Sequence, residues 1–155
     1  AFGQLSLLLQ LPGVDAPARA AEEKGGALTA GEQQELDERI EAAKHWLADY
    51  APDEARIAVR DDLPADAVRE LSAEERAWLL ALADAADAAK PTGGEAWQSL
   101  IFSAAKEGGL QPVRAFASLY AAFLGRTNGP RAGWLLAALD PALVVTRLRA
   151  AAAIQ

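Results

Sequence analysis

The stretch from Leu124 to Gly133 constrains the fold of this chain more than any other. It holds three glycines and one proline, namely Gly125, Gly129, Pro130 and Gly133. Glycine and proline interrupt regular helices and favour tight turns. The segments on either side, 111–124 and 131–139, are apolar at helical spacing. The sequence therefore predicts two core helices joined by a tight, exposed turn.

The same turn carries two arginines, Arg126 and Arg131. A rigid turn that presents guanidinium groups at the tip of a helical hairpin suits contact with phosphates or base edges. The alternative is a helix C-terminus followed by a helix N-terminus, with both arginines simply in solvent. Taken alone, these residues favour the second interpretation, because arginines in loops are usually surface side chains.

Composition favours an all-α protein. Alanine and leucine dominate, and β-branched residues are few outside 57–59 and 144–145. Short loops between amphipathic segments predict an antiparallel helical bundle or α-helix cage of about seven to eight helices. The chain has no cysteine, which excludes disulfides and thiolate chemistry, and its single histidine, His45, excludes a histidine-based metal site. No apolar run approaches the ~20 residues of a membrane-spanning helix.

Charge is divided unevenly along the chain. Residues 1–90 carry 9 Lys and Arg against 19 Asp and Glu, a balance of −10, whereas residues 91–155 carry 6 against 3, a balance of +3; together these give the −7 of the whole chain. The sign changes at Lys90–Gly94, a stretch with one proline and two glycines. We therefore expect a helical connecting subdomain over 1–90 and a C-terminal helical subdomain over 91–155.

Several helices can be placed from local signals. A stripe on the segment 31–50 predicts one long amphipathic helix, formed by Leu36, Ile40, Ala43, Leu47 and Tyr50. His45 lies beside that stripe and is expected to be packed or solvated rather than catalytic. Ser72 and Glu75 form a capping-box pattern at a helix start. Asp140 followed by Pro141 marks the start of the last helix.

Two further predictions concern side-chain orientation near the C-terminus. The helix that begins at Pro112 is predicted to bury Val113, Phe116, Tyr120 and Phe123 and to expose Arg114 and Ser118. On the last helix, Val144 and Leu148 are expected to face inward and Arg147 to lie near the outer face.

Upstream, 55–60 is predicted to be extended. Asp61 and Asp62 are interpreted as a helix-start signal rather than as an acid–base pair or cation site.

No catalytic pattern can be assembled from these residues. There is no nucleophile beside a base, no metal-ligand spacing and no phosphate-binding loop, because the glycine pairs lack the lysine and preceding strand of such a loop. The informative residues are instead arginines and one tryptophan in the C-terminal part, namely Arg114, Arg126, Arg131, Trp134 and Arg147. Aromatic rings and guanidinium planes stack on the unpaired bases of single-stranded RNA. For Trp134 a position in the core is the favoured alternative.

Two segments resemble class I lysyl-tRNA synthetases. Phe116, Leu119 and Tyr120 match the family's F-x-x-L-Y run, 123–125 replaces its paired leucines before the glycine, and 129–133 matches its G-P-R-x-G turn. Upstream, 39–52 is similar to the family's R-I-x-x-A-x-x-W-x-x-x-Y-A-P stretch. The two matches occur in the family's order, and together they extend over most of the chain.

This resemblance implies that the chain is the C-terminal, anticodon-binding α-helix cage of such an enzyme. The parent enzyme attaches lysine to its tRNA by using ATP, and both ATP and lysine bind a catalytic domain whose HIGH- and KMSKS-type motifs are absent here. We therefore expect no cofactor in this chain. The expected partners are the anticodon loop of lysine tRNA and the catalytic domain of the same chain. Neither DNA nor a membrane is expected as a partner, and the expected location is cytoplasmic.

The motif itself assigns no base-contacting residue. The first hypothesis is that the anticodon loop lies against the face bearing Arg126 and Arg131, with Trp134, Arg114 and Arg147 as further candidates. Gly125, Gly129, Pro130 and Gly133 are expected to serve the turn geometry. No methionine occurs anywhere, so we expect a piece of a longer gene product. Two alternatives remain open at this point. One is the anticodon-binding domain of a glutamyl-type synthetase, and the other is a helical protein-interaction or dimerisation domain without RNA binding, which the apolar opening segment 2–11 would suit.

Overall fold

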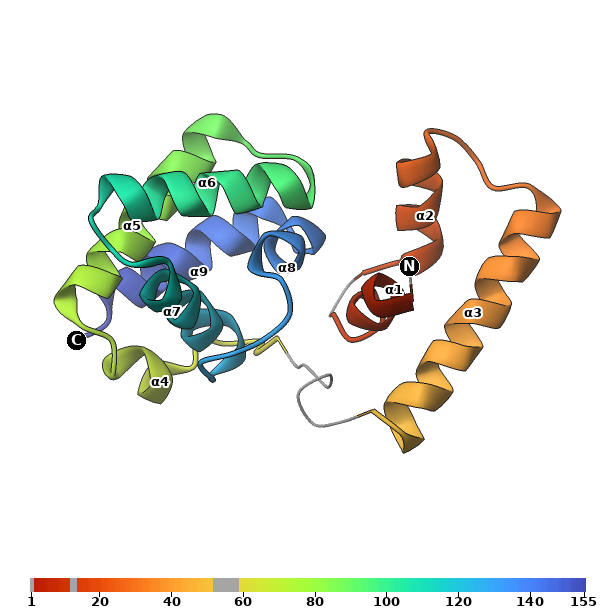
Figure 1. Cartoon of the computed structure of the whole chain (residues 1–155), viewed down its shortest axis with the longest axis horizontal. Coiled ribbons are helices and arrows are strands. Elements are labelled where there is room, and N and C mark those ends of the chain that lie inside the picture. The colour runs from red at the N-terminus through yellow and green to blue at the C-terminus, as the bar shows by residue number, and fades with distance from the viewer. Residues whose placement is uncertain (1, 12–13, 52–58) are drawn as a thin grey trace. The chain divides into compact units, whose positions relative to one another are not determined.

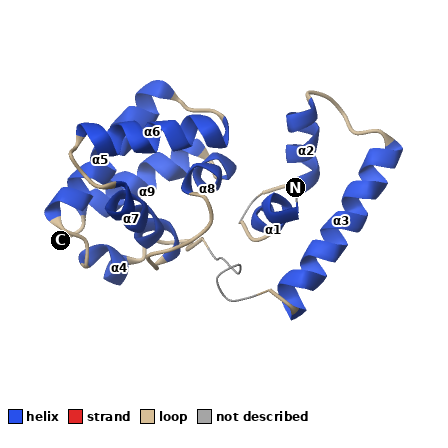
Figure 2. Ribbon diagram, viewed as in Figure 1, coloured by secondary structure: helices blue, strands red, loops and turns tan. Residues whose placement is uncertain are grey.

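A computed structural model of the chain describes residues 2–11, 14–51 and 59–155 (Figure 1). The chain forms two compact units, residues 1–58 and residues 59–155. All regular secondary structure in the described residues is helical, as Figure 2 shows, and this confirms the predicted all-α class. The described residues form nine helices, slightly more than expected.

The first unit contains α1 (Phe2–Leu8), α2 (Ala16–Lys24) and α3 (Ala30–Asp49). Local signals set their ends. The Asp15 side chain accepts from the Ala18 amide at the start of α2, and Gly25 ends that helix in the left-handed region at φ 80°. Thr29 and Glu32 form a capping box at the start of α3. Helix α1 packs against α3, and Leu7, Leu11, Ile40 and Ala43 are buried.

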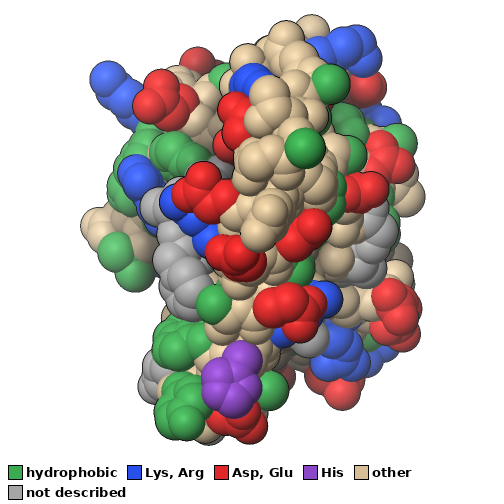
Figure 3. All heavy atoms as spheres, turned by 90° about the vertical axis from the view of Figure 1, so that its right-hand side faces the viewer, with side chains coloured by type: hydrophobic (Ala, Val, Ile, Leu, Met, Phe, Trp, Pro, Cys, Tyr) green, Lys and Arg blue, Asp and Glu red, His purple; other side chains and the backbone are tan. Residues whose placement is uncertain are grey.

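Helix α3 has the stripe that the sequence predicts along most of its length. Ile40 and Ala43 are buried and Leu36 and Leu47 are half-buried, whereas Tyr50, just past the helix, is 70% exposed. His45 is exposed to solvent, in line with the expectation that it is packed or solvated. Its Nδ1 lies 3.0 Å from an Asp49 carboxylate oxygen. Acidic side chains gather along the outer face of this helix in Figure 3. The exposed acidic residues are Glu32, Glu35, Asp37, Glu38, Glu41 and Asp49.

Glu32 provides a testable feature of this unit. Lys24 at the end of α2 donates to its carboxylate, and the Thr29 amide donates to the same oxygen at 2.8 Å. The Lys24 hydrogen bond, followed by those with Thr29, lowers the pKa of Glu32 from 4.5 to about 2. Because the folded-state pKa is depressed, the stabilisation is complete above about pH 4.5 and disappears as pH falls through 2. In an NMR pH titration, Glu32 should titrate near 2 and Lys24→Ala should raise its pKa. An unchanged pKa in that variant would show that the ion pair is absent in solution.

The second unit contains six helices within the described residues. They are α4 (Ala65–Arg69), α5 (Ala73–Ala89), α6 (Gly93–Glu107), α7 (Pro112–Leu124), α8 (Ala132–Ala138) and α9 (Pro141–Ala153). The principal packing pairs are α6 with α8 and α5 with α9. The largest fully buried side chains come from α4 to α9, and include Val68, Leu79, Leu82, Ile101, Phe123, Leu135 and Leu148. These helices therefore enclose one shared core (Figure 1).

Two helix starts predicted in this unit from capping side chains are confirmed. Ser72 and Glu75 form the reciprocal capping box at α5, with bonds of 3.2 and 2.8 Å. The Asp140 carboxylate accepts from the Ala142 amide at the start of α9, with Pro141 in the first turn. Such signals are local, so they can be recognised without knowing what the helix packs against.

The division into units differs from the subdomain boundary expected at Lys90–Gly94. Lys90 ends α5 in the left-handed region at φ 46°, and α6 begins only three residues later at Gly93. Helices α5 and α6 pack together in the second unit, whose first residue is Val59. The charge balance therefore changes sign at a tight turn between two helices of one core, not at a boundary between units.

Side-chain orientation on α7 differs in part from the prediction. Val113 is 78% exposed and Ser118 is fully buried, whereas the burial of Phe123 is confirmed. Ser118 Oγ donates to the Arg114 carbonyl at 2.7 Å, so its hydroxyl is satisfied within the helix and can face the core. Ala115, Leu119 and Ala122 complete the buried face. The buried face is therefore rotated from the one that the large apolar residues suggested.

The segment before α4 falls only partly in the described structure. Most of the predicted extended stretch, 55–58, lies outside the described residues. Asp61 and Asp62 do precede a helix, α4, as interpreted from the sequence. None of the helices that the structure describes is long and apolar enough to cross a membrane.

Candidate nucleic-acid interface

The turn between α7 and α8 is shaped first by Gly125. This residue ends α7 with φ 70° and ψ 21°, a left-handed conformation that glycine adopts without strain, and its amide donates to the Ala121 carbonyl at 3.2 Å. A Cβ at this position would lie 3.3 Å from the Pro64 Cβ. Gly125 therefore serves both the conformation of the turn and its close packing against the segment before α4.

Gly129 and Pro130 close the turn against Tyr120. A Cβ on Gly129 would lie 2.7 Å from Leu124 Cδ1 and 2.9 Å from Tyr120 Cδ1, which leaves no room for a side chain. The Tyr120 hydroxyl donates to the Pro130 carbonyl at 2.5 Å. Burial raises the pKa of Tyr120, so the hydroxyl keeps its proton for this bond at neutral pH. Two side chains of α7, those of Tyr120 and Leu124, therefore fix the position of residues 129 and 130 of the turn.

Gly133 seats the start of α8 on the start of α6. Its amide donates to Gln98 Oε1 at 2.9 Å. A Cβ on Gly133 would lie 2.5 Å from the Gly94 carbonyl oxygen and 2.7 Å from the Gln98 amide nitrogen. A Cβ on Gly94 would in turn overlap the ring of Trp134. These two glycines therefore allow the close approach of α6 and α8.

This packing predicts an unusual response to a glycine-to-alanine change. Alanine is normally the better helix former, by about 1 kcal/mol. Gly133→Ala should nevertheless lower the free energy of unfolding by about 2 kcal/mol, because the atoms it meets are backbone atoms that must shift. Gly31→Ala in α3 is the matched control, since no neighbouring atom lies within 4 Å of its Cβ position. Urea unfolding followed by circular dichroism measures both, and a stabilising Gly133→Ala would contradict the close approach.

Arg131 and Trp134 form a stacked pair at the start of α8. The exposed Arg131 carries its guanidinium carbon 4.0 Å from the centre of the Trp134 ring system. Trp134 is half-buried because part of its ring lies on Gly94. Cations over tryptophan faces are attracted by the ring quadrupole, by about 0.5–1 kcal/mol at exposed sites. Trp134 thus contributes to the α6–α8 packing and also orients Arg131.

Arg126 follows Gly125 at the α7 end of the turn and is half-buried. Its Nη2 is buried, and no hydrogen-bond partner for this atom occurs in the part of the chain that the structure describes. A buried donor without an acceptor costs about 1–3 kcal/mol. Rotation of this side chain toward solvent would let the nitrogen donate to an oxygen acceptor and would remove that cost.

The structure places Arg114 and Arg147 in different surroundings from the turn arginines. Arg114 is engaged by α5: it donates to Glu75 at 3.0 Å, to Glu74 at 3.2 Å and to Ser72 Oγ at 3.0 Å, and the two carboxylates raise its pKa. The expectation that Arg147 lies near the outer face is wrong, because the residue is only 6% exposed. Both guanidinium groups hold elements of the fold together.

The interactions of Arg147 explain its burial. Its guanidinium donates to the carbonyls of Arg60 at 2.7 Å and Asp61 at 2.9 Å, and to that of Ala122 at 3.5 Å. Burial lowers its pKa, and the carboxylates of Asp62 and Asp61 oppose this shift. A guanidinium stays protonated under such shifts and is less strongly hydrated than an ammonium group, so it is suited to a buried site of this kind.

Arg60 is the residue near this turn that sequence reasoning missed. Its amide donates to the Phe123 carbonyl at 3.0 Å, and its Nη1 lies 3.6 Å from the position of a Cβ on Gly125. The sequence offers no local signal for this approach, because residues 60 and 125 are far apart in the chain. The only pointer is that Arg60 precedes the helix-start signal of α4.

The pairing of the arginines distinguishes this turn from the rest of the chain. Within the described residues, the arginines with neither a hydrogen bond nor an ion pair from their guanidinium are Arg60, Arg126 and Arg131, and all three lie at the α7–α8 turn. The remaining described arginines each have a polar partner, namely Arg19, Arg39, Arg69, Arg76, Arg114, Arg147 and Arg149. The unpaired arginines of the described residues therefore converge on one turn.

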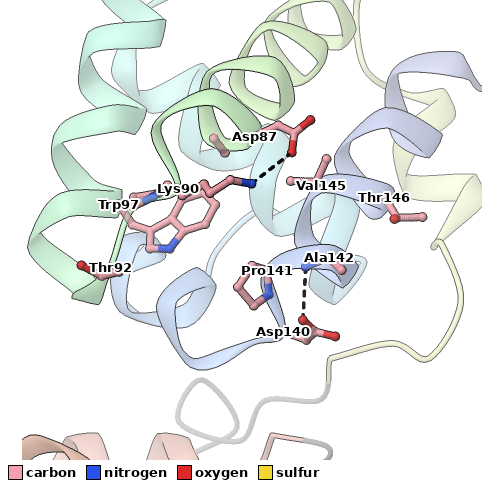
Figure 4. A pocket seen from close by; sticks show the side chains of 11 residues that line it. Asp87, Lys90, Thr92, Trp97, Asp140, Pro141, Ala142, Val145 and Thr146 are labelled. Carbon is pink, nitrogen blue, oxygen red and sulfur yellow. Dashed lines mark hydrogen bonds and ion pairs between the residues drawn. The ribbon is translucent and has the colours of Figure 1, made fainter.

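A pocket of about 600 Å³ lies elsewhere in the second unit, between the end of α5 and the starts of α6 and α9 (Figure 4). Its wall is mainly apolar and includes Trp97, Pro91, Pro141 and Val145. The polar groups at its edge serve the fold: Lys90 pairs with Asp87 at 3.9 Å, and Asp140 caps α9. Among the described residues no group of three or more histidine, cysteine or carboxylate side chains could hold a metal ion. The α7–α8 turn is therefore the stronger candidate site.

The chain is similar in sequence to several lysine–tRNA ligases. The chain is 40% identical over 105 residues to the lysine–tRNA ligase of Methanopyrus kandleri, covering 67% of this chain and 18% of that protein. It is 32% identical over 120 residues to that of Archaeoglobus fulgidus, covering 77% and 23%. With the ligase of Thermococcus kodakarensis it shares 31% identity over 153 residues, covering 96% and 28%.

The matches cover most of this chain but only a part of each relative. The chain spans about a quarter of the length of these curated relatives, and no protein-family model matches it. The match to the Thermococcus protein includes 96% of this chain, so both compact units take part in the similarity. The chain is therefore related by sequence to the lysine–tRNA ligases of archaea and corresponds, over most of its length, to one region of those proteins.

Proposed function

We propose that this chain is the anticodon-binding region of a lysine–tRNA ligase and that its α7–α8 turn contacts the anticodon loop of lysine tRNA. In this proposal ATP and lysine bind a catalytic domain elsewhere in the same longer, cytoplasmic protein. The observation that carries the proposal is the convergence of unpaired guanidinium groups on one rigid turn. The similarity to proteins named lysine–tRNA ligases supports lysine tRNA as the RNA.

Each group at the turn has a chemical role in this proposal. The exposed guanidinium of Arg131 contacts a phosphate or a base edge, and its stacking on Trp134 keeps its plane oriented. The Nη2 of Arg126, which has no partner in the described structure, donates a hydrogen bond to an oxygen of the ligand. Unpaired bases of an anticodon loop stack on the guanidinium plane or on the open part of the Trp134 ring. Arg114 and Arg147 support the helices that carry the turn rather than contact RNA directly.

The distribution of charge over the two units favours one binding surface for nucleic acid. The first unit presents an acidic outer face on α3 (Figure 3), which repels a polyanion. The unpaired arginines lie in the second unit at the α7–α8 turn. Nucleic acid should therefore bind at the turn rather than over the whole surface, and its affinity should decline steeply with salt.

Fluorescence anisotropy with two RNA hairpins tests the proposal. One is the anticodon stem-loop of lysine tRNA, and the other has the same stem with the anticodon of glutamate tRNA, which also addresses the glutamyl-type alternative. We expect tighter binding to the lysine hairpin and a log–log salt slope of about −2, which corresponds to about three single-strand phosphates at −0.7 each. Equal weak binding to both hairpins would contradict anticodon reading. Absent RNA binding together with a concentration-dependent mass in light scattering would favour the protein-interaction alternative.

A further inference from the structure

We propose that Arg60 is a third RNA-contacting cation at the α7–α8 turn and that the buried guanidinium of Arg147 is its positioning residue. This inference rests on the proposed function. It adds a contact from a segment 65 positions before Gly125, so the interface is built from two separate parts of the chain. In this proposal the buried Arg147 does not contact RNA itself but fixes the backbone of Arg60, which does.

The backbone of Arg60 is fixed on both sides. Its amide donates to the Phe123 carbonyl at 3.0 Å, near the end of α7. Its carbonyl accepts from Arg147 Nη2 at 2.7 Å, and the same nitrogen donates to the Asp61 carbonyl at 2.9 Å. Residue 60 is thus attached to α7 through one bond and to α9 through another, and its position is determined by the packing of those two helices.

Arg147 also ties this junction to the last turn of α7. Its Nη1 donates to the Ala122 carbonyl at 3.5 Å, and its guanidinium carbon lies 5.7 Å from the centre of the Phe123 ring. The last carbonyls of a helix lack partners within the helix and lie at the negative end of its dipole, where a cation is favourable. Arg147 therefore satisfies α7 and the residue 60–61 backbone with one planar group.

The side chain of Arg60 is left available by this arrangement. Arg60 is exposed, and no hydrogen bond or ion pair of its guanidinium occurs within the described ranges. Its Nη1 lies 3.6 Å from the Cβ position of Gly125, immediately before Arg126 in the chain. Because Gly125 has no side chain, the guanidinium can lie directly over the turn. Cations from two segments therefore flank the end of α7, an arrangement suited to phosphates of one bound strand.

The first experiment compares Arg60→Ala with the matched control Arg149→Ala in the full chain. Arg149 is an exposed arginine of the same unit, and it is already paired with Asp84 at 3.3 Å and Asp87 at 3.2 Å. Both changes remove one positive charge. With the lysine anticodon hairpin, Arg60→Ala should weaken binding about fivefold to tenfold and reduce the magnitude of the salt slope by about 0.7, the value of one single-strand phosphate. Arg149→Ala should change neither quantity appreciably.

A double-mutant cycle tests the positioning role. Arg147→Lys keeps the charge but cannot donate to three carbonyls in the plane of a guanidinium. If Arg147 positions Arg60, the Arg60→Ala change should have little further effect on affinity or salt slope in the Arg147→Lys background. A purely structural role of Arg147 would leave the full effect of Arg60→Ala in place. Circular dichroism checks that the variants are folded.

The outcomes distinguish failure of the proposed function from failure of the Arg60 assignment. If the wild-type chain fails to bind the hairpin, the proposed function and this inference both fail. If wild type binds but Arg60→Ala behaves like Arg149→Ala, only the assignment of Arg60 is overturned. If Arg147→Lys does not fold, hydrogen exchange in wild type decides the positioning. The guanidinium protons of Arg147 that donate to the Arg60 and Asp61 carbonyls should then be protected, and their rapid exchange would overturn the positioning role.

Discussion

Arg147→Met is expected to lower the free energy of unfolding of residues 59–155 by about 3–4 kcal/mol. The substitution keeps an unbranched apolar stem but removes the guanidinium that bonds three backbone carbonyls. Hydrogen bonds to charged groups contribute about 1.5–3 kcal/mol each, and carbonyls left buried without a donor add a desolvation cost. The bond to Ala122 is long at 3.5 Å, and removing a buried charge returns its own desolvation cost, so the net loss is smaller than the sum of three bonds. Because a domain of this size is stable by only about 5–15 kcal/mol, the loss is large.

Urea unfolding followed by circular dichroism measures this effect, with Arg149→Met as the matched control. Arg149 forms ion pairs at the surface, and such pairs contribute about 0–1 kcal/mol. A pronounced difference between the two variants is therefore expected from burial alone. If Arg147→Met were as stable as wild type, the three carbonyl bonds would not form in solution, and the placement of the segment before α4 would need revision.

The double variant Arg126→Ala/Arg131→Ala is expected to weaken binding to the lysine anticodon hairpin about 100-fold. Each guanidinium contributes a charge-assisted contact of roughly 1.4 kcal/mol, which is about tenfold in affinity. The magnitude of the salt slope should fall by about 1.4, because two single-strand phosphate contacts are lost. Both side chains lie on one turn, so their single effects need not be additive.

The controls for this experiment separate charge from geometry. Arg131→Lys retains a cation but has no planar group to stack on Trp134. It should keep the salt slope and lose part of the affinity. Arg149→Ala removes one charge of the same unit and should leave binding nearly unchanged. An Arg131→Ala single variant that is folded and binds RNA like wild type would show that the RNA contact lies elsewhere.

Local features of the fold could be predicted because the responsible residues are near one another in sequence. The capping box at Ser72 and Glu75 and the cap at Asp140 are confirmed for this reason. The stripe on α3 is confirmed through Leu47 because helical periodicity alone defines it. Gly125 could be identified as a turn residue, since a glycine after an apolar helical segment is a common helix end.

Features that depend on distant partners could not be predicted. Arg147 is buried because the carbonyls of residues 60 and 61, 87 and 86 positions away, accept from it. Ser118 faces the core because its hydroxyl bonds within the helix, and Val113 is exposed because α7 turns another face to its neighbours. The availability of Arg60, Arg126 and Arg131 likewise emerges only once the partners of the other arginines are known.

The most direct test of the central claim is an NMR titration of the ¹⁵N-labelled chain with the lysine anticodon hairpin. If the RNA lies on the α7–α8 turn, the largest shifts should occur at amides from Gly125 to Trp134 and at the Nε–Hε groups of Arg126 and Arg131. The amide of Arg60 should shift with them, whereas α3 and the α5–α9 face near Arg149 should not. Saturating shifts confined to α3, or to the pocket around Trp97, would contradict the account.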